Sequence, residues 1–462
     1  MSTGAKEINL THGSLPKNIL LFSLPLMLSN ILQVLFNMSD IAVVGRFSSP
    51  AALGAVGSCT IMVTLFTGLL IGMGGGINAI TAQCMGAGDK PRLSRTVHTA
   101  LLVSVIYGVL IMAAGLCGAG ALLRVLHTKP ELYDGALLYM RVYLLGTPAL
   151  ALYNFGNGVL SAAGDSRRPL AYLFTAGVIN VLLNLFFVIV CRLGVLGVAL
   201  ASAISQYVSA FLILFRLFVC KKDYALSFCE MKSDRSIAGR VLLLGVPAGL
   251  QNAIFAVANL FLQSAVNSFD TVVVEGNAAA ANADALVYDI MAAFYLACTT
   301  FMGQNIGAKN KKRVIQSYWI CMAYAFASAV LAGGLLLLFG HQFLSVFTTD
   351  EAVIAEGIAR LRLMACSYCI SAFMDCTIAA SRGLGKTVVP TVVVMMGSCV
   401  FRIIWIYTVF AHFRTLTSLY LLYAFSWAIT ALFEIVYFLY AYKKQTALID
   451  GAENEEVAPC DL

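Results

Sequence analysis

The sequence predicts an all-α membrane protein, with about twelve transmembrane helices in two pseudo-symmetric six-helix bundles around a central cleft. Three observations predict this fold class: the composition, the number of long apolar runs, and an internal repeat. Hydrophobic residues make up 60% of the 462 residues and charged residues only 11%, against roughly 25% charged residues in soluble domains. A soluble fold could not bury so much apolar surface, so lipid is the expected solvent.

A helix needs about 20 consecutive apolar residues to cross a bilayer. The chain contains a series of apolar runs of about this length. The first six runs predict spans near residues 18–44, 51–80, 95–120, 136–160, 169–190 and 195–219. The other six predict spans near residues 238–266, 278–302, 315–340, 356–381, 388–411 and 417–442.

These runs divide the chain into four expected parts. Residues 1–219 form the N-terminal six-helix bundle and residues 238–442 the C-terminal bundle. The charged segment 220–237 is expected to be a cytoplasmic linker loop between them. The polar and acidic segment 443–462 has a composition typical of disorder and predicts a disordered cytoplasmic tail.

The distribution of basic residues predicts the orientation of the chain in the membrane. The loops on the side that holds both termini carry 21 of the 30 Lys and Arg residues. By the positive-inside rule both termini face the cytoplasm of a bacterial cell, and the protein is a multi-pass protein of the cell inner (cytoplasmic) membrane. Because the basic residues lie in short loops, the net charge of +7 does not indicate a nucleic-acid partner.

An internal repeat relates the two halves at an offset of 221 or 222 residues. The coinciding pairs include Pro25 with Pro247, Asn37 with Asn259, Gln83 with Gln304, and Gly164 with Gly385. Six spans is an even number, so both halves cross the membrane in the same sense. Two parallel bundles with a cleft between them indicate a transporter that exposes the cleft to each side in turn.

Several motifs carry a family resemblance. They are the Gln-x-x-Gly-Ala motifs that begin at Gln83 and Gln304, the first-span pattern Asn37-Met-Ser-Asp40-x-x-x-Val44-Gly45-Arg46, the fifth-span pair Asn180 and Asn184, and the segment Gly194–Ser202. In combination they resemble the multidrug and toxic compound extrusion (MATE) family, and the last two resemble its DinF-like branch. The resemblance extends over about residues 14–442.

This resemblance implies multidrug efflux: antiport of organic, often cationic and amphipathic xenobiotics against inward flow of H⁺ or Na⁺. The expected partners are small organic molecules and the lipid bilayer, and we expect a monomer. No cofactor is implied besides the coupling ion, H⁺ or Na⁺. The sequence contains no catalytic constellation and no metal-binding motif, which argues against an enzyme.

Ionisable side chains within spans are costly and are therefore functional candidates. They are Asp40, Asp289, Asp375, Arg402 and Glu434. For Arg402 and Glu434, on neighbouring spans, we expect a buried ion pair.

Asp40 is the leading candidate for cation coupling. Its neighbour Asn37 shares its helical face, and helix depths place three further polar residues in the same outer half of the first bundle: Asn180, Asn184 and Ser202. The resemblance implies that these positions form the coupling site, by proton exchange at Asp40 or by oxygen ligation of Na⁺. No other metal is expected. The alternative is that Asp40 caps a helix or pairs with Arg46.

The family pattern usually has Asp where Asn184 stands, and an amide cannot exchange a proton. Asp40 alone must then titrate, or the ion is Na⁺, or coupling occurs elsewhere. The rival location is the C-terminal bundle, where Asp375 occupies the tenth span. The seventh span, however, has no acidic residue.

Faces rich in amide and aromatic groups suit amphipathic cations, because aromatic rings attract positive charge. The predicted cleft residues are Gln33, Tyr153, Asn154, Asn252, Phe255, Asn259, Gln263, Tyr288, Asp289 and Asp375. The alternative is that many of them hydrogen-bond neighbouring helices. Pro25 removes a backbone hydrogen bond inside the first span and is a candidate hinge.

Two other functions are alternatives for a protein with this many spans. A flippase for lipid-linked saccharides is expected to have a more cationic cleft and additional spans. An intramembrane enzyme or receptor would need catalytic residues or a soluble output domain, and the sequence has neither.

Overall fold

The computed structural model describes residues 8–457, with side chains for residues 8–450. Within this range all regular structure is helical. Eleven helices of this range are long and apolar enough to cross a membrane, and one bent pair makes a twelfth span. The predicted fold class, an all-α membrane protein, is therefore confirmed.

The helices of the first half are α1 (Leu15–Phe47), α2 (Pro50–Ala87), α3 (Lys90–Val125), α4 (Pro130–Leu144), α5 (Thr147–Ala162), α6 (Arg167–Leu185) and α7 (Val195–Val219). A π-helical turn, Phe186–Val190, continues α6 to the end of its span. A single 3-10 turn, Phe228–Glu230, lies in the loop after α7.

The long helices of the second half are α8 (Arg235–Val266), α9 (Thr271–Gly307), α10 (Lys311–Leu344), α11 (Glu351–Gly383) and α15 (Leu416–Val457). The span Val388–Phe413 lies between α11 and α15. It consists of α12 (Val388–Val394), α13 (Phe401–Trp405), α14 (Ala411–Phe413) and the π-helical turns Met395–Val400 and Ile406–Phe410.

The fourth span is broken. The sequence predicts one helix over 136–160, but α4 and α5 meet at an angle of 45°. Pro148 lies in the first turn of α5, where a missing backbone N–H costs nothing and a new helix can begin.

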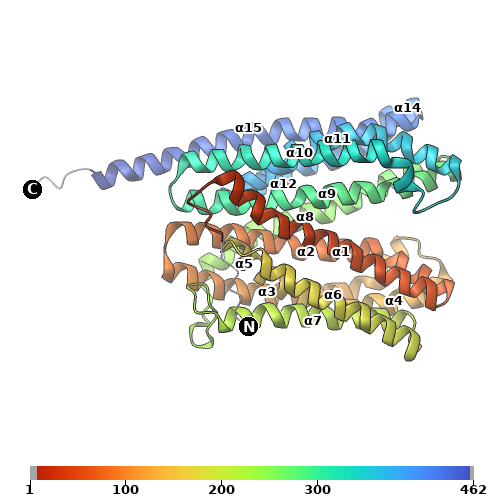
Figure 1. Cartoon of the computed structure of the whole chain (residues 1–462), viewed down its shortest axis with the longest axis horizontal. Coiled ribbons are helices and arrows are strands. Elements are labelled where there is room, and N and C mark those ends of the chain that lie inside the picture. The colour runs from red at the N-terminus through yellow and green to blue at the C-terminus, as the bar shows by residue number, and fades with distance from the viewer. Residues whose placement is uncertain (1–7, 458–462) are drawn as a thin grey trace, which may run out of the picture. The chain divides into compact units, whose positions relative to one another are not determined.

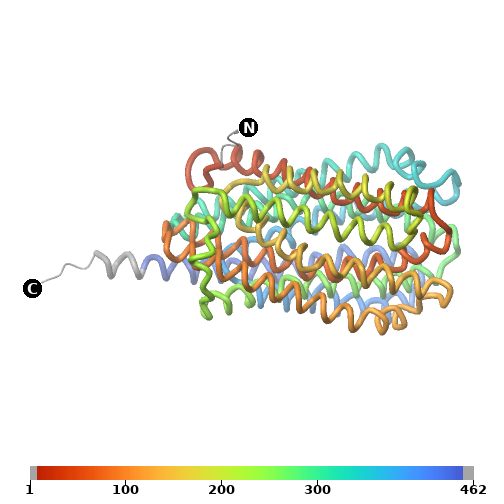
Figure 2. The backbone as a smooth tube through the Cα atoms, turned by 90° about the horizontal axis from the view of Figure 1, so that it is seen from below, coloured from red at the N-terminus to blue at the C-terminus, as the bar shows by residue number. Residues whose placement is uncertain are grey.

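The chain forms two compact units. Unit 1 contains Leu24–Met85 and Asp89–Ala256, and unit 2 contains Asn9–Ser23, Gly86–Gly88 and the chain from Val257. In unit 1, α5 packs against α3 and α7, and α7 also packs against α4 and α6. The backbone tube shows the long helices running lengthwise (Figure 2). In unit 2, α11 packs against α9, α10 and α15, which run alongside one another (Figure 1).

The units do not coincide with the two expected halves. The first part of α8 belongs to unit 1, because glycines let it approach α2 closely. A Cβ built at Gly72 would overlap the backbone of Gly249, and a Cβ at Gly76 would overlap Gly245. The α1 helix likewise passes from unit 2 to unit 1 between Ser23 and Leu24.

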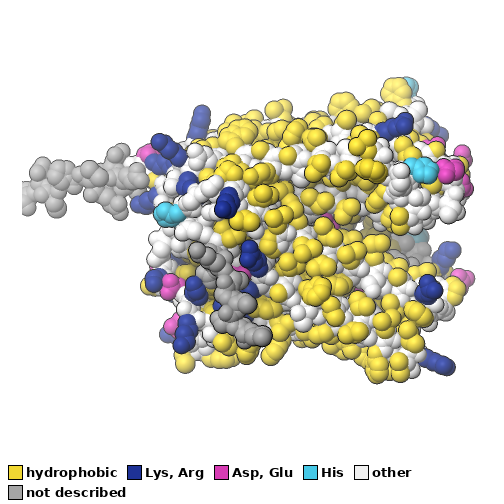
Figure 3. Space-filling view, in the orientation of Figure 1, with side chains coloured by type: hydrophobic (Ala, Val, Ile, Leu, Met, Phe, Trp, Pro, Cys, Tyr) yellow, Lys and Arg dark blue, Asp and Glu magenta, His cyan; other side chains and the backbone are white. Residues whose placement is uncertain are grey.

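The exposed side chains match a lipid environment. Large apolar residues are exposed along the spans, for example Leu110 at 60%, Phe211 at 65% and Leu338 at 76%. Lys and Arg side chains gather at the helix ends, and apolar side chains cover the surface between them (Figure 3). Since exposed apolar patches of this extent do not occur on soluble monomers, lipid is the solvent of these faces.

The expected tail differs in the structure, because α15 continues as a helix to Val457. Strong helix formers such as Lys443, Lys444 and Ala447 extend it. Lys311 of α10 pairs with Asp450 at this end of α15. Residues 458–462 lie outside the described range.

Candidate functional site

The candidate site in unit 1 is centred on Asp40, a side chain of α1 that is only 9% exposed. One carboxylate oxygen, Oδ2, accepts a hydrogen bond from Ser202 Oγ of α7 at 3.0 Å. The other, Oδ1, accepts one from Asn184 Nδ2 of α6. Three helices thus contribute to one buried polar cluster.

The two asparagines of α6 complete this cluster. Asn184 Nδ2 also donates to Asn180 Oδ1 at 3.2 Å, so both protons of this amide group are used. Asn184 is fully buried, yet its Oδ1 has no hydrogen-bond partner among the described residues. Buried acceptors are rarely left empty, so this oxygen next to a carboxylate is suited to a cation or a proton donor.

Within the described residues, Asp40 has no basic partner. Its hydrogen bonds come only from neutral groups, an amide and a hydroxyl. Arg46, the partner considered from the sequence, is exposed and forms no ion pair with Asp40. No basic side chain of the described residues therefore balances the charge of the carboxylate.

A glycine lets two of the three helices of the cluster, α1 and α6, approach each other closely. Gly177 lies about one turn before Asn180 on α6, and the ring of Phe36 on α1 occupies the space that a Cβ at Gly177 would need. Phe36 is one turn before Asp40. The Phe36 contact therefore sets the separation between α1 and α6 next to the carboxylate.

Two tyrosines of α4 face the cluster and were missed from the sequence. Tyr139 and Tyr143 are buried and stack with ring centroids 5.9 Å apart, and both lie within electrostatic range of Asp40. Tyr143 also approaches Thr67, with the two hydroxyl oxygens 3.4 Å apart. Their spacing of four residues places them on one face of an apolar span, and this spacing could have identified them from the sequence.

The structure leaves Asn37 out of the cluster. Its side chain is exposed and makes no hydrogen bond to Asp40 or to the asparagines of α6. Three residues of a helix turn by about 300°, so the two side chains point roughly 60° apart. That angle directs Asn37 away from α6.

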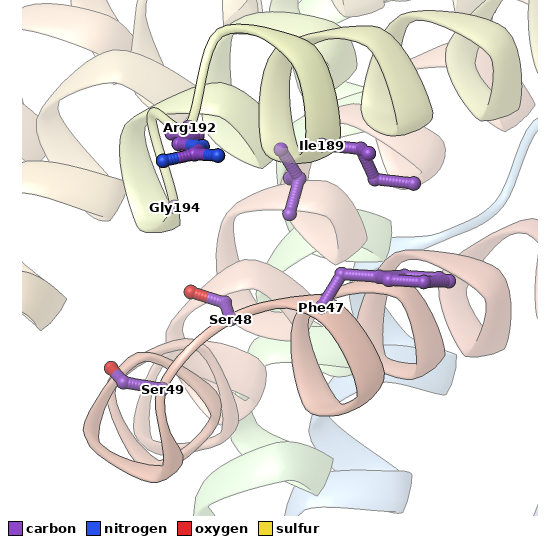
Figure 4. Close-up of a pocket in the computed structure, with 7 residues that line it drawn as sticks. Phe47, Ser48, Ser49, Ile189, Arg192 and Gly194 are labelled. Carbon is purple, nitrogen blue, oxygen red and sulfur yellow. The ribbon is translucent and has the colours of Figure 1, made fainter.

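A hollow of about 370 Å³ opens at the same end of unit 1 as the cluster. It lies about one turn beyond Asn184 along α6 and about two turns beyond Asp40 along α1. Phe47, Ser48 and Ser49 line one side of the hollow, and Ile189, Arg192 and Gly194 line the other (Figure 4).

Of the predicted cleft residues in unit 1, three use their polar groups within the unit. Tyr153 Oη donates to the Pro169 carbonyl at 3.2 Å and Asn154 to the carbonyl of Leu150 at 2.9 Å. Asn252 donates to the Gly68 carbonyl at 3.1 Å. Gln33 is exposed and Phe255 half-buried.

The remaining predicted cleft residues lie in unit 2. Asn259 accepts a hydrogen bond from Arg402 at 3.4 Å, and Gln263 donates to Asn267 at 2.9 Å. Tyr288 is 48% exposed, and Asp289 and Asp375 are half-buried.

The expected ion pair between Arg402 and Glu434 does not form. The Arg402 guanidinium lies over the ring of Tyr423, 4.7 Å from its centroid, and Nε donates to Ser426 Oγ at 3.3 Å. These partners precede Glu434 on α15 by about two to three turns. Along the helix, Glu434 is therefore too far from the guanidinium.

A buried ion pair in unit 2 was not found from the sequence. Arg360 of α11 pairs with Asp284 of α9, and Tyr368 donates to the same carboxylate. Arg360 also donates to the Asn277 carbonyl at 2.9 Å. Asp284 and Arg360 lie near the ends of their predicted spans. Their positions along the sequence therefore did not distinguish them from residues at the membrane interface.

The paired six-helix repeats, the lipid-facing exterior and a buried polar cluster around a carboxylate inside a span are typical of a membrane transporter, and not of an enzyme. The family model MatE matches residues 25–186 and 247–408. Both ends of the second match lie 222 residues after those of the first (25 and 247, 186 and 408), which is the offset of the repeat. The chain belongs to the MatE family, as the resemblance to MATE transporters predicted.

Known proteins similar to this chain include two from Bacillus subtilis. The "Probable multidrug resistance protein YpnP" is 29% identical over 365 residues, which are 79% of this chain and 81% of that protein. The "Probable multidrug resistance protein YoeA" is 26% identical over 389 residues, 82% of this chain and 83% of that protein.

A solved structure is also similar. It is described as the outward-facing conformation of a multidrug resistance MATE family transporter of the MOP superfamily. It is 25% identical to this chain and superposes with a TM-score of 0.87, covering 96% of this chain and 99% of that one.

The contact between Gly177 and Phe36 leads to a prediction. Gly177→Leu should lower the stability of the protein by roughly 1–3 kcal/mol, because the added side chain overpacks the contact between α1 and α6. Gly57→Leu is the matched control, since a Cβ at Gly57 meets nothing within 4 Å. Thermal unfolding in detergent measures both variants, and Phe36→Ala should partly rescue Gly177→Leu. Equal midpoints for Gly177→Leu and Gly57→Leu would contradict this account of the packing.

Proposed function

We propose that this chain is a multidrug exporter that carries organic, cationic and amphipathic compounds out of the cell in exchange for H⁺ or Na⁺. The observation that carries the proposal is the buried Asp40 carboxylate, which has only neutral hydrogen-bond partners, beside an amide oxygen without a partner. The names of the similar proteins, which refer to multidrug resistance, support the substrate class.

The cluster supports a cation as the coupling species. A carboxylate within a membrane span is costly unless a positive charge or a proton compensates it. Binding of a cation at Asp40 would remove this cost, so occupancy of the site would alter the relative stability of different conformations of unit 1.

The donor set is compatible with either ion. The two oxygens of Asp40, the free Oδ1 of Asn184, and the oxygens of Asn180 and Ser202 are hard ligands that suit Na⁺. A proton needs only the Asp40 carboxylate. Asn184 cannot exchange a proton itself, so in the proton-coupled form of the proposal Asp40 alone titrates.

Alternating access would require the two units to move. The α1 helix passes from unit 2 to unit 1 between Ser23 and Leu24, directly before Pro25. Proline inside a helix removes one backbone hydrogen bond and favours bending. We therefore propose that Pro25 is a hinge. The proposal also includes a protein that functions as a monomer and has both termini in the bacterial cytoplasm.

The first prediction of this proposal concerns Asp40→Asn. This variant should lose gradient-driven export, because an amide can neither take up a proton nor balance the charge of Na⁺. Reconstituted liposomes with cationic dyes measure export under separately imposed proton and sodium gradients. Asp134→Asn, an exposed aspartate of α4, is the matched control and should export like wild type. Wild-type export by Asp40→Asn under both gradients would refute the coupling role, and binding of a lipid-linked saccharide without dye transport would favour a flippase.

The second prediction concerns the hinge. Pro25→Ala restores the N–H that can bond to the carbonyl of Leu21, and relieves a cost of about 3 kcal/mol in a helix interior. The variant should unfold at a higher temperature and export dye more slowly than wild type. Pro130→Ala is the control, because Pro130 lies in the first turn of α4, where proline costs little. An unchanged export rate in Pro25→Ala would show that bending at this residue is not needed.

A further inference from the structure

Glu434 of α15 is a buried carboxyl group that the proposed transport mechanism does not use. Its side chain is 0% exposed, and neither Oε1 nor Oε2 has a hydrogen-bond partner among the described residues. Buried carboxylates normally accept several hydrogen bonds or pair with a cation. Glu434 has neither, so its environment favours the uncharged form.

The charged groups that face Glu434 are Asp375 and Arg382 of α11, which packs against α15. Arg382 Nε is itself buried without a hydrogen-bond partner. On its own helix, Glu434 faces Tyr437. The pair of carboxyl groups and the single guanidinium would carry a net negative charge if both acids were ionised.

The other elements around α15 do not supply the missing positive charge. The α12 helix and the following turn Met395–Val400 contribute only Cys399 as a titratable residue. Arg402 of α13 lies over the rings of Tyr423 and Trp427. Tyr318 of α10 packs against Phe438, one turn beyond Glu434.

Further groups face Asp375 rather than Glu434. They are Tyr288 and Tyr295 of α9, together with Arg382 and Arg402. Asp375 therefore has two basic residues in its surroundings, whereas Glu434 shares only Arg382 with it. Of the two acids, Glu434 is the one left to hold a proton.

We propose that Glu434, next to Asp375 and Arg382, is a second protonatable site of this transporter, located in unit 2 and separate from Asp40. One proton on the Glu434 carboxyl makes the set of two acids and one guanidinium neutral. The site extends the proposed function by adding a proton-binding group, but its protonation does not depend on the role of Asp40.

The surroundings favour a proton over a metal ion. A hard metal cation needs several oxygen ligands at once, and the positively charged Arg382 guanidinium in these surroundings would repel it. A proton needs a single oxygen. Lys443 follows Glu434 on α15 by about 14 Å, so the site lies towards the cytoplasmic end of its span in the orientation predicted above.

The infrared spectrum of the purified protein tests this proposal. A carboxyl group that holds a proton absorbs at a C=O stretching frequency distinct from that of a carboxylate. Wild type at neutral pH should show a protonated-carboxyl band that is absent from Glu434→Gln, and that shifts in protein containing ¹³C-labelled glutamate. Glu351→Gln, at an exposed glutamate, should remove only carboxylate absorption.

A glutamate-derived protonated-carboxyl band that persists when Na⁺ is added at constant pH supports the proposal. Absence of any such band in the labelled wild type, or its loss on addition of Na⁺, overturns it. The labelled wild type decides the question even if Glu434→Gln fails to fold. Because the spectrum needs no transport, failure here is distinguishable from failure of Asp40→Asn to abolish coupled export.

Discussion

The buried Asp40 carboxylate is the interaction on which the rest of the account depends. It lies in a helix whose surroundings are lipid and apolar side chains, and it is held by Asn184 and Ser202 from two other helices. Neither partner carries a positive charge, so under the proposed function a proton or a metal cation would compensate the charge of the carboxylate. Small residues make this geometry possible, because Gly177 lets α6 approach Phe36 of α1.

Much of the fold follows from the sequence, because lipid restricts a chain to long apolar helices. The spans and the repeat could be predicted directly from the sequence. Asp40 was singled out by the energetic cost of an ionisable side chain within a span, together with the family motifs. The break between α4 and α5 could not be predicted, because the apolar run continues through Gly146 and Pro148. Hydropathy identifies a span but does not indicate a bend within it. The helical course of α15 beyond Lys443 agrees with the helix propensity of its residues, but the pairing of Lys311 with Asp450 at its end depends on the packed structure.

Side-chain partners were harder to predict than helices. Asn37 shares a face with Asp40, yet a small angular difference directs it away from α6. The Arg402 guanidinium contacts aromatic rings and not Glu434. The position of each residue along its helix decides which side chains lie at the same level and can make contact. These outcomes depend on helix rotation and register, which a single sequence specifies only through the packed structure.

The most direct test of the central claim is the affinity of a cationic dye for the purified protein without any gradient. If the cation and the dye are exchanged in one cycle, each must weaken the binding of the other. In wild type, lowering the pH or adding Na⁺ should raise the dissociation constant of the dye, measured by fluorescence anisotropy. In Asp40→Asn this dependence should disappear. The same dependence in both proteins would contradict the account, because the linkage would then originate elsewhere.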